Sequence, residues 1–209
     1  MFTGIVEEIG RVTSRTGGRL VVRAPIAASD AAVGDSISVG GVCLTLVGLD
    51  GDELAFELSD ETFERTSLGA LRPDAPVNVE RPATLASRLG GHLVQGHVDG
   101  VARVSAVIPD GDDGARLSIR LPAELLRYVV EKGSVTVDGV SLTVAAIRGD
   151  IVDVALIPHT LRMTTLGSAH EGDPVNVEVD VVAKYVARNL EHLMSGGAAV
   201  VQPGKERTA

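Results

Sequence analysis

Two short stretches of this sequence carry reactive side chains at matched positions of a repeated motif. The motif reads GVCLTL at 41–46 and GVSLTV at 139–144, so the thiol of Cys43 corresponds to the hydroxyl of Ser141. Either group can add to an electrophile or exchange a proton, which suggests two related sites with unequal tasks. A lone cysteine in an apolar strand is more often a packing residue, so packing remains the alternative for Cys43.

A histidine beside glycines, His97 in the segment QGHVDG at 95–100, could carry a proton near neutral pH. The same residue could simply cap a turn, and the sequence leaves both interpretations open. The first copy reads GIVEE at 4–8, which matches GHVDG at 96–100 and places Ile5 opposite His97. His92 lies in the same stretch as His97 but has the weaker claim, and we expect it to be structural.

These motifs belong to a duplication that covers most of the chain. Residues 36–80 align with residues 134–178 at a constant offset of 98 without a gap, and 18 of the 45 pairs are identical. Upstream, residues 4–12 align with residues 96–104 at an offset of 92, and the second copy has the longer loop DGDDG. A unit of roughly 95 residues can close its own core, so the duplication predicts two copies of one fold rather than a solenoid.

Each copy has the pattern of a mainly β fold. Ile37 and Val39 alternate with polar residues, so the apolar residues of this strand have odd numbers. After Gly40 and Gly41 the apolar residues have even numbers, and this parity flip predicts a tight turn or bulge. Five or six short strands separated by Gly and Asp turns favour a small closed barrel, because closure removes the edge strands. We therefore expect two tandem barrels, at 1–91 and 92–180.

Helices should be few. The segments ETFERTSLG and HTLRMTTLG each predict one short helix, ended by Gly69 and Gly167, and PAELLRYVVEK at 122–132 predicts a longer one. The segment 181–195 predicts an amphipathic helix that folds back on its own barrel or meets other subunits. Its apolar stripe consists of Val182, Val186, Asn189, Leu190 and Leu193. The tail at 196–209 has no usable period, and we expect disorder there.

Composition excludes several classes of protein. The net charge is −9 and no run of Lys or Arg exceeds a pair, which disfavours a nucleic-acid partner. No stretch approaches the ~18 apolar residues of a membrane span, and MFTGIVEE does not resemble an export signal. A single cysteine rules out an internal disulfide and fits the reducing cytoplasm. With 2% aromatic residues, the core must be aliphatic.

Six segments together resemble the riboflavin synthase family over residues 1–194. They are MFTGIV, GVCLT, GGHLVQGHVDG, KGSVTVDGVSLTV, IPHTLRMTTL and PVNVEVDVVAKYV, in this order. The resemblance implies two six-stranded Greek-key barrels related by a pseudo-twofold axis, and a C-terminal helix that assembles a homotrimer. The site would lie between the N-terminal barrel of one subunit and the C-terminal barrel of a neighbour.

The resemblance also implies a reaction. Family members dismutate two molecules of 6,7-dimethyl-8-ribityllumazine by moving a four-carbon unit from one to the other, without a cofactor or a metal. The products are riboflavin and 5-amino-6-(D-ribitylamino)uracil. Two copies of one compound need two similar pockets, and their unequal roles as donor and acceptor require pockets that differ. Association with lumazine synthase is a further possibility.

The resemblance assigns site residues to matching positions. It places Gly4, Ile5 and Val6 in the first pocket with Cys43, and it implies that the hydroxyls of Thr45 and Thr143 face the pyrimidinedione carbonyls. The expected catalytic residues are Cys43, His97, Ser141, Phe2 and Asp180. The expected substrate-binding residues are Gly4, Ile5, Val6, Cys43, Leu44, Thr45, Glu57, Leu58, Ser59, Asp60, Glu61, Thr62, Gly96, His97, Val98, Lys132, Ser141, Leu142, Thr143, Ile157, Pro158, His159, Thr160, Leu161 and Arg162.

Several alternatives stay open. Asp180 could be a surface carboxylate before the last helix, Phe2 could simply dock the terminus in the core, and Asn78 and Asn176 could contact the ribityl chain or bond structurally. Many relatives have Asn at the position of Gly40. The glycine of this chain lacks the side-chain hydrogen bond that an asparagine could make there. A non-catalytic lumazine or flavin antenna protein has the same fold and is the main rival function. A flavin reductase would need a glycine-rich phosphate loop, which the sequence lacks.

Overall fold

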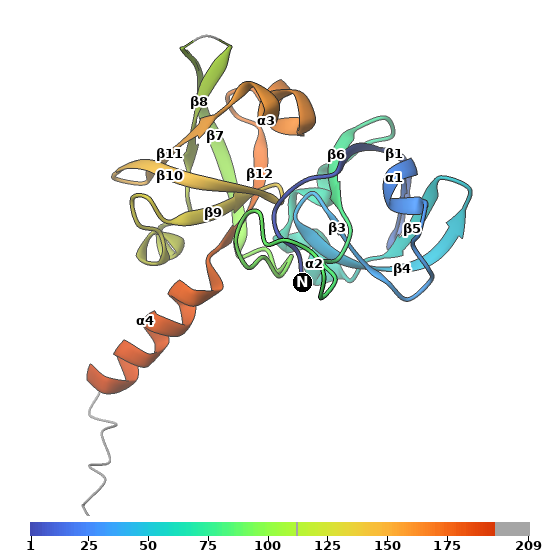
Figure 1. The fold of residues 1–209 in the computed structure, drawn as a ribbon, viewed down its shortest axis with the longest axis horizontal. Coiled ribbons are helices and arrows are strands. Elements are labelled where there is room, and N and C mark those ends of the chain that lie inside the picture. Colours follow the sequence, from blue (N-terminus) through green and yellow to red (C-terminus); the bar gives the residue numbers. More distant parts are fainter. Residues whose placement is uncertain (112, 195–209) are drawn as a thin grey trace, which may run out of the picture.

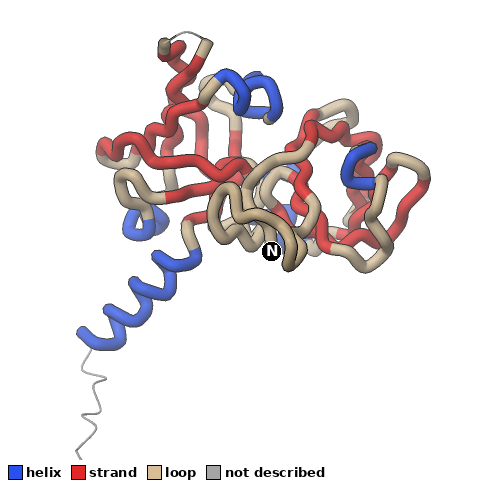
Figure 2. Tube along the Cα trace, viewed as in Figure 1, coloured by secondary structure: helices blue, strands red, loops and turns tan. Residues whose placement is uncertain are grey.

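The computed structural model describes residues 1–111 and 113–194, which form two closed β-barrels followed by one helix (Figure 1). Strands build both barrels, and short helices lie in the connections between them (Figure 2). All neighbouring strands pair antiparallel. The predicted pair of mainly β barrels is therefore confirmed, with six strands in each.

Both barrels close in the same Greek-key order. The first is β1-β2-β5-β4-β3-β6 and the second is β10-β11-β8-β7-β12-β9, which becomes the same cycle once the strands are matched by the repeat. The first set is β1 (Glu8–Thr16), β2 (Arg19–Arg23), β3 (Ser36–Val39), β4 (Val42–Asp50), β5 (Glu53–Glu57) and β6 (Pro76–Glu80). The second set is β7 (Gly100–Asp110), β8 (Gly114–Arg120), β9 (Ser134–Val137), β10 (Val140–Arg148), β11 (Ile151–Leu156) and β12 (Pro174–Val179).

Each barrel encloses its own aliphatic core. The first core is built from Val, Leu, Ile and Ala together with Phe56, and the second from Ala, Val, Leu and Ile. Inward residues alternate with outward ones along the strands, as in β4, where Val42, Leu44 and Leu46 are buried. The β-branched and aliphatic residues that set the sequence period therefore fill the interior.

The parity flip at Gly40 and Gly41 is a two-residue hairpin turn between β3 and β4. Both residues have positive φ, +55° and +79°, and Asp138 and Gly139 repeat this at +47° and +80°. Positive φ at both central residues is the signature of a type I′ turn, which suits the strand twist. The two turns meet: a Cβ on Gly41 would lie 2.5 Å from the amide nitrogen of Gly139, so only glycine fits.

Two matched asparagines bond the barrels to each other across this meeting point. Asn78 donates to the carbonyl oxygen of Asp138 at 2.9 Å, and Asn176 donates to that of Gly40 at 2.8 Å. Their Oδ1 atoms accept from the amides of Thr165 (2.8 Å) and Ser67 (2.7 Å). Such reciprocal contacts are those of a pseudo-twofold axis. They give both asparagines structural partners.

The helices after β5 and β11 differ from the prediction. Each expected helix is two short ones: α2 (Asp60–Arg65) then the 3₁₀ helix η1 (Ser67–Ala70), and α3 (Pro158–Met163) then η3 (Thr165–Ser168). Thr66 and Thr164 interrupt them in extended conformation, and their hydroxyls accept from the amides of Leu68 in η1 and Leu166 in η3. A threonine that can cap the next turn ends the first helix before the glycine is reached.

The predicted helix at 122–132 is also wrong. The structure has only the 3₁₀ helix η2 (Ala123–Tyr128), and Val129 is extended (φ −107°, ψ +131°). Val129 and Val130 are β-branched, which lowers helix propensity at that end. A one-turn helix, α1 (Pro25–Ala28), was not predicted, because four residues carry no measurable period.

The last helix, α4 (Val181–Met194), projects away from both barrels (Figure 1). Lys184 pairs with Asp99 at 2.7 Å, and Arg127 pairs with Glu191, so charged residues tether it. Its apolar stripe is open to solvent in the single chain: Val182, Val186, Leu190 and Leu193 are 52–63% exposed. No helix in the described part of the chain is long and apolar enough to cross a membrane. The tail predicted to be disordered lies outside the described residues.

Candidate active site

Strands β4 and β10 present the two reactive residues on the outer faces of their barrels. Cys43 and Ser141 are partly exposed, whereas Leu44 and Leu142, the next residue in each strand, point into the cores. Thr45 and Thr143 are exposed on the same faces as Cys43 and Ser141. The expected binding residues of the two motifs therefore lie on outer barrel surfaces, apart from the leucines.

A glycine segment crosses each of these strands at close range. The amide of Cys43 donates to the carbonyl oxygen of Gly96 at 2.8 Å, and the amide of Ser141 donates to that of Gly4 at 2.8 Å. Both glycines have φ +76°, and an added Cβ would lie 2.7 Å from Cβ of Cys43 or 2.5 Å from Cβ of Ser141. Glycine is required at both crossings, for conformation and for space.

These crossings correct the expected grouping of the pockets. Gly4, Ile5 and Val6 were expected beside Cys43, in the barrel of their own copy. The structure instead places Gly4 against Ser141 in the second barrel, and Gly96 of the second copy against Cys43 in the first. The first segment of each copy thus lies on the other copy's strand before it enters its own barrel.

A buried carboxylate at the end of each last strand holds these segments. Glu80, on β6, accepts from the amides of Thr3 and Gly4, and Glu178, on β12, accepts from those of Gln95, Gly96 and His97, all at 2.6–3.0 Å. Burial raises the pKa of both carboxyls, while the amide donors oppose that shift. Sequence analysis missed these residues, although PVNVE ends both copies of the repeat.

Ser141 has a histidine partner that sequence analysis did not assign. Nδ1 of His92 lies 2.8 Å from Oγ of Ser141, and His92 is 9% exposed. Burial lowers the pKa of His92, and the charge of Asp180 partly opposes this, so the surroundings favour the neutral imidazole. A neutral imidazole can accept the serine proton. The sequence could not show this contact, because the two residues lie 49 positions apart.

The remaining candidates divide between structural and exposed positions. Asp180 caps α4 by accepting from the amide of Val182 at 2.9 Å, while its charge acts on His92. Phe2 is buried and forms an isolated bridge with Val94. Lys132 is exposed in a turn with φ +67°. Exposed side chains that can meet a ligand include His97, Glu57, Ser59, Asp60, Glu61, Ile157, His159 and Arg162, whereas Leu58 is buried.

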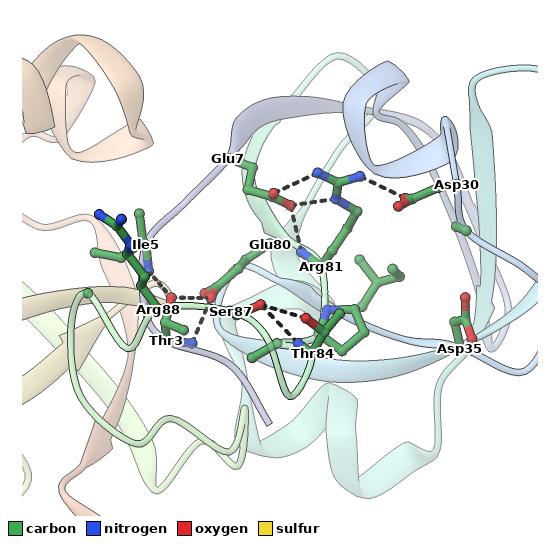
Figure 3. A pocket seen from close by; sticks show the side chains of 15 residues that line it. Thr3, Ile5, Glu7, Asp30, Asp35, Glu80, Arg81, Thr84, Ser87 and Arg88 are labelled. Carbon is green, nitrogen blue, oxygen red and sulfur yellow. Dashed lines mark hydrogen bonds and ion pairs between the residues drawn. The ribbon is translucent and has the colours of Figure 1, made fainter.

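A cavity of about 580 Å³ lies elsewhere, between the first barrel and residues 81–90 (Figure 3). Arg81 spans its wall and pairs with Glu7 at 2.8 Å and Asp30 at 2.7 Å. The hydrogen bonds from Arg81 lower the pKa of Glu7. Cys43, His97 and Ser141 do not line the cavity, so we do not assign the chemistry to it.

Comparisons with known proteins agree with this geometry. The model of the lumazine binding domain matches residues 3–82 and 95–180. The chain is 52% identical to riboflavin synthase of Mycobacterium tuberculosis over 196 residues, which cover 90% of this chain and 97% of that protein. It is 40% identical to riboflavin synthase of Actinobacillus pleuropneumoniae over 194 residues, which cover 91% and 90%.

Solved structures give the same picture of the fold. The crystal structure of LumP complexed with riboflavin superposes with a TM-score of 0.79 at 28% identity, and it covers 86% of this chain and all of that one. LumP complexed with 6,7-dimethyl-8-(1'-D-ribityl) lumazine superposes with a TM-score of 0.76 at 26% identity, covering 86% and 99%.

Proposed function

Because this chain belongs to the riboflavin synthase family and is an enzyme of that kind, we propose that it converts two 6,7-dimethyl-8-ribityllumazine molecules into riboflavin and 5-amino-6-(D-ribitylamino)uracil. One substrate loses a four-carbon unit and the other gains it. The two products together contain all the atoms of the two substrates. The reaction therefore needs no oxidant, reductant or further reactant.

One observation carries the proposal. The chain offers two matched strands, each crossed by a glycine segment of the other copy, with a thiol at Cys43 in one and a hydroxyl at Ser141 in the other. Two like pockets suit two identical molecules, and the exchanged reactive atom suits the unequal roles of donor and acceptor. Holding both rings together removes the entropy of a bimolecular encounter, which is worth up to ~7–11 kcal/mol.

Different residues in the two pockets would act in different steps of the reaction. The first step removes a proton from the methyl group at carbon 7 of one lumazine, and the heterocycle spreads the resulting negative charge. Neutral His92, acting through Ser141 at 2.8 Å, supplies a base on the second barrel. On the first barrel, exposed His97 and partly exposed Cys43 supply a proton carrier and a nucleophile for addition at carbon 7 of the other lumazine.

The site needs a second copy of the chain. Cys43, Thr45, Ser141 and Thr143 all face outwards, so in one chain the two ligand faces remain open. The uncovered stripe of α4 provides a surface through which three subunits can associate, bringing the N-terminal barrel of one against the C-terminal barrel of the next. Association with lumazine synthase would use a further surface. An enzyme with one free thiol suits the reducing cytoplasm.

Turnover tests the proposal. The purified protein is incubated with 6,7-dimethyl-8-ribityllumazine, and riboflavin is followed by its absorbance and fluorescence. We expect riboflavin to accumulate in proportion to enzyme and time. Tight binding of the lumazine with no riboflavin formed would contradict the proposal and favour an antenna protein, which binds the same class of ligand.

A further inference from the structure

The last strand of the second barrel ends in a carboxylate that binds the backbone of a functional residue. Oε1 of Glu178 accepts from the amide of Gln95 at 2.8 Å, and Oε2 accepts from the amides of Gly96 at 2.8 Å and His97 at 2.9 Å. Glu178 is 2% exposed, so these three donors replace water around its charge. The backbone from 95 to 97 is therefore tied to the second barrel while its carbonyl at Gly96 meets the first.

The matched carboxylate of the first copy, Glu80, accepts from the backbone amides of two residues, whereas Glu178 accepts from those of three. Glu80 accepts from the amide of Thr3 (2.6 Å), from Oγ1 of Thr3 (2.7 Å) and from the amide of Gly4 (3.0 Å). The next amide, that of Ile5, donates to Oγ1 of Thr3 at 3.2 Å instead. A threonine hydroxyl thus replaces the third amide, and the carboxylate does not reach the residue aligned with His97.

The difference falls on a position where the two copies differ in chemistry, Ile5 against His97. Isoleucine cannot carry a proton, whereas a histidine that does so must point in one direction. The main-chain bond from His97 to Glu178 fixes the peptide plane from which the imidazole extends, and the adjacent Gly96 carbonyl fixes its distance from Cys43. A positioning error near 1 Å can cost about 100-fold in rate.

We propose that Glu178 is a positioning residue of the riboflavin-forming reaction, which holds the backbone of His97 so that its imidazole faces the pocket of Cys43. This inference rests on the proposed function. Glu80 is the matched structural carboxylate, since its bonds hold Thr3 and Gly4 and leave His97 untouched.

A double-mutant cycle tests the proposal. Glu178→Gln keeps the size of the side chain but turns one acceptor into an amide that faces N–H donors, and we expect kcat to fall about 10- to 100-fold. In the His97→Ala background the same change should lower kcat by less than about twofold, because the imidazole it positions is gone. Glu80→Gln, the matched control, should lower kcat by the same factor in both backgrounds.

Other outcomes would overturn the proposal. One is an equal loss from Glu178→Gln with and without His97, which indicates a general structural role. A second is an unchanged kcat in a folded Glu178→Gln protein. A third is an effect of Glu80→Gln that also disappears without His97. If Glu178→Gln does not fold, Glu178→Asp carries the same cycle, because its shorter carboxylate stays charged but cannot reach all three amides.

An NMR measurement keeps this inference separate from the proposed function. The imidazole C–H signals of His97 should occupy one dispersed position in the unliganded protein, and Glu178→Gln should move them toward the position of a freely rotating histidine. Glu80→Gln should leave them in place. A wild-type protein that makes no riboflavin would contradict the function alone, whereas unmoved His97 signals in folded Glu178→Gln would overturn the positioning role.

Discussion

The amide of Cys43 donates a hydrogen bond to the carbonyl oxygen of Gly96 at 2.8 Å, so a segment of the second copy lies on the reactive strand of the first. The bond from Ser141 to Gly4 repeats this relationship in the opposite direction. Each of these two strands is therefore crossed by residues of the other copy.

Gly96→Ala tests this crossing. A Cβ there would lie 2.7 Å from Cβ of Cys43, so the segment must move away from the strand, and we expect riboflavin formation to fall on the order of 100-fold. Gly51→Ala is the control, because Gly51 also has positive φ (+56°) but nothing lies within 4 Å of its added Cβ. The backbone strain in Gly51→Ala costs about 1 kcal/mol of stability, and this variant should have a kcat close to that of the wild type. Equal kcat losses in the two variants would contradict the argument.

The contact between His92 and Ser141 predicts a pH dependence. Burial lowers the pKa of His92 below its usual 6.5, which favours the neutral base. We expect kcat to fall in acidic solution, where the imidazole becomes protonated. Ser141→Ala should lower kcat about 100-fold or more. Ser168→Ala, a change to an exposed serine in η3, is the control. A rate that rises on acidification would argue against this base.

Asp138 predicts a pH effect on stability. Desolvation raises the pKa of its carboxyl from 3.8 to about 7, and the hydrogen bond from the amide of Asn176 only partly opposes this. Since the folded state then binds the proton more tightly than the unfolded state, this group lowers stability as pH rises from about 4 to 7. Asp138→Asn keeps the acceptor and tolerates positive φ, and it should add on the order of 1–2 kcal/mol at pH 8 but little at pH 4.

The matched control is Asp74→Asn, at an exposed aspartate with φ +68°. Thermal unfolding of both variants across this pH range checks the prediction. An equal gain for both, or a gain for Asp138→Asn that is the same at pH 4 and pH 8, would show that the charge at Asp138 is not the cause.

The exposed apolar stripe of α4 leads to a prediction about the association of subunits. Leu190→Glu places a charge among exposed apolar residues of the stripe, and sedimentation velocity should then show dissociation to single chains, with loss of riboflavin formation. Arg188→Glu, on another face of the same helix, should leave the assembly intact. A wild-type protein that sediments as a single chain and still makes riboflavin would show that one chain completes the site.

Much of the fold could be predicted from sequence because it rests on local patterns. The duplication gave two barrels, and the parity flip at Gly40 and Gly41 gave the hairpin turn. The lengths of helices could not be read, because Thr66 and Thr164 use their hydroxyls to cap the following turn. In a segment of nine residues, such a side-chain bond outweighs helix propensity.

The site was less accessible to prediction. A repeat shows which residues correspond, as Cys43 and Ser141 do, but not which copy's segment lies against them. The crossing depends on bonds to Glu80 and Glu178, and the repeated PVNVE that contains both carboxylates does not show which backbone amides they bind. The partner of Ser141 could not be predicted for the same reason, because His92 lies 49 residues away from it in the sequence.

The ratio of substrate consumed to product formed tests the central claim most directly. Lumazine, riboflavin and the ribitylaminouracil are quantified together through a complete reaction of the wild-type enzyme. If two pockets bind two identical molecules, we expect two lumazines to be consumed and one ribitylaminouracil to be released for each riboflavin formed. A ratio of one lumazine to one riboflavin would contradict the account, because the four-carbon unit would then come from another source.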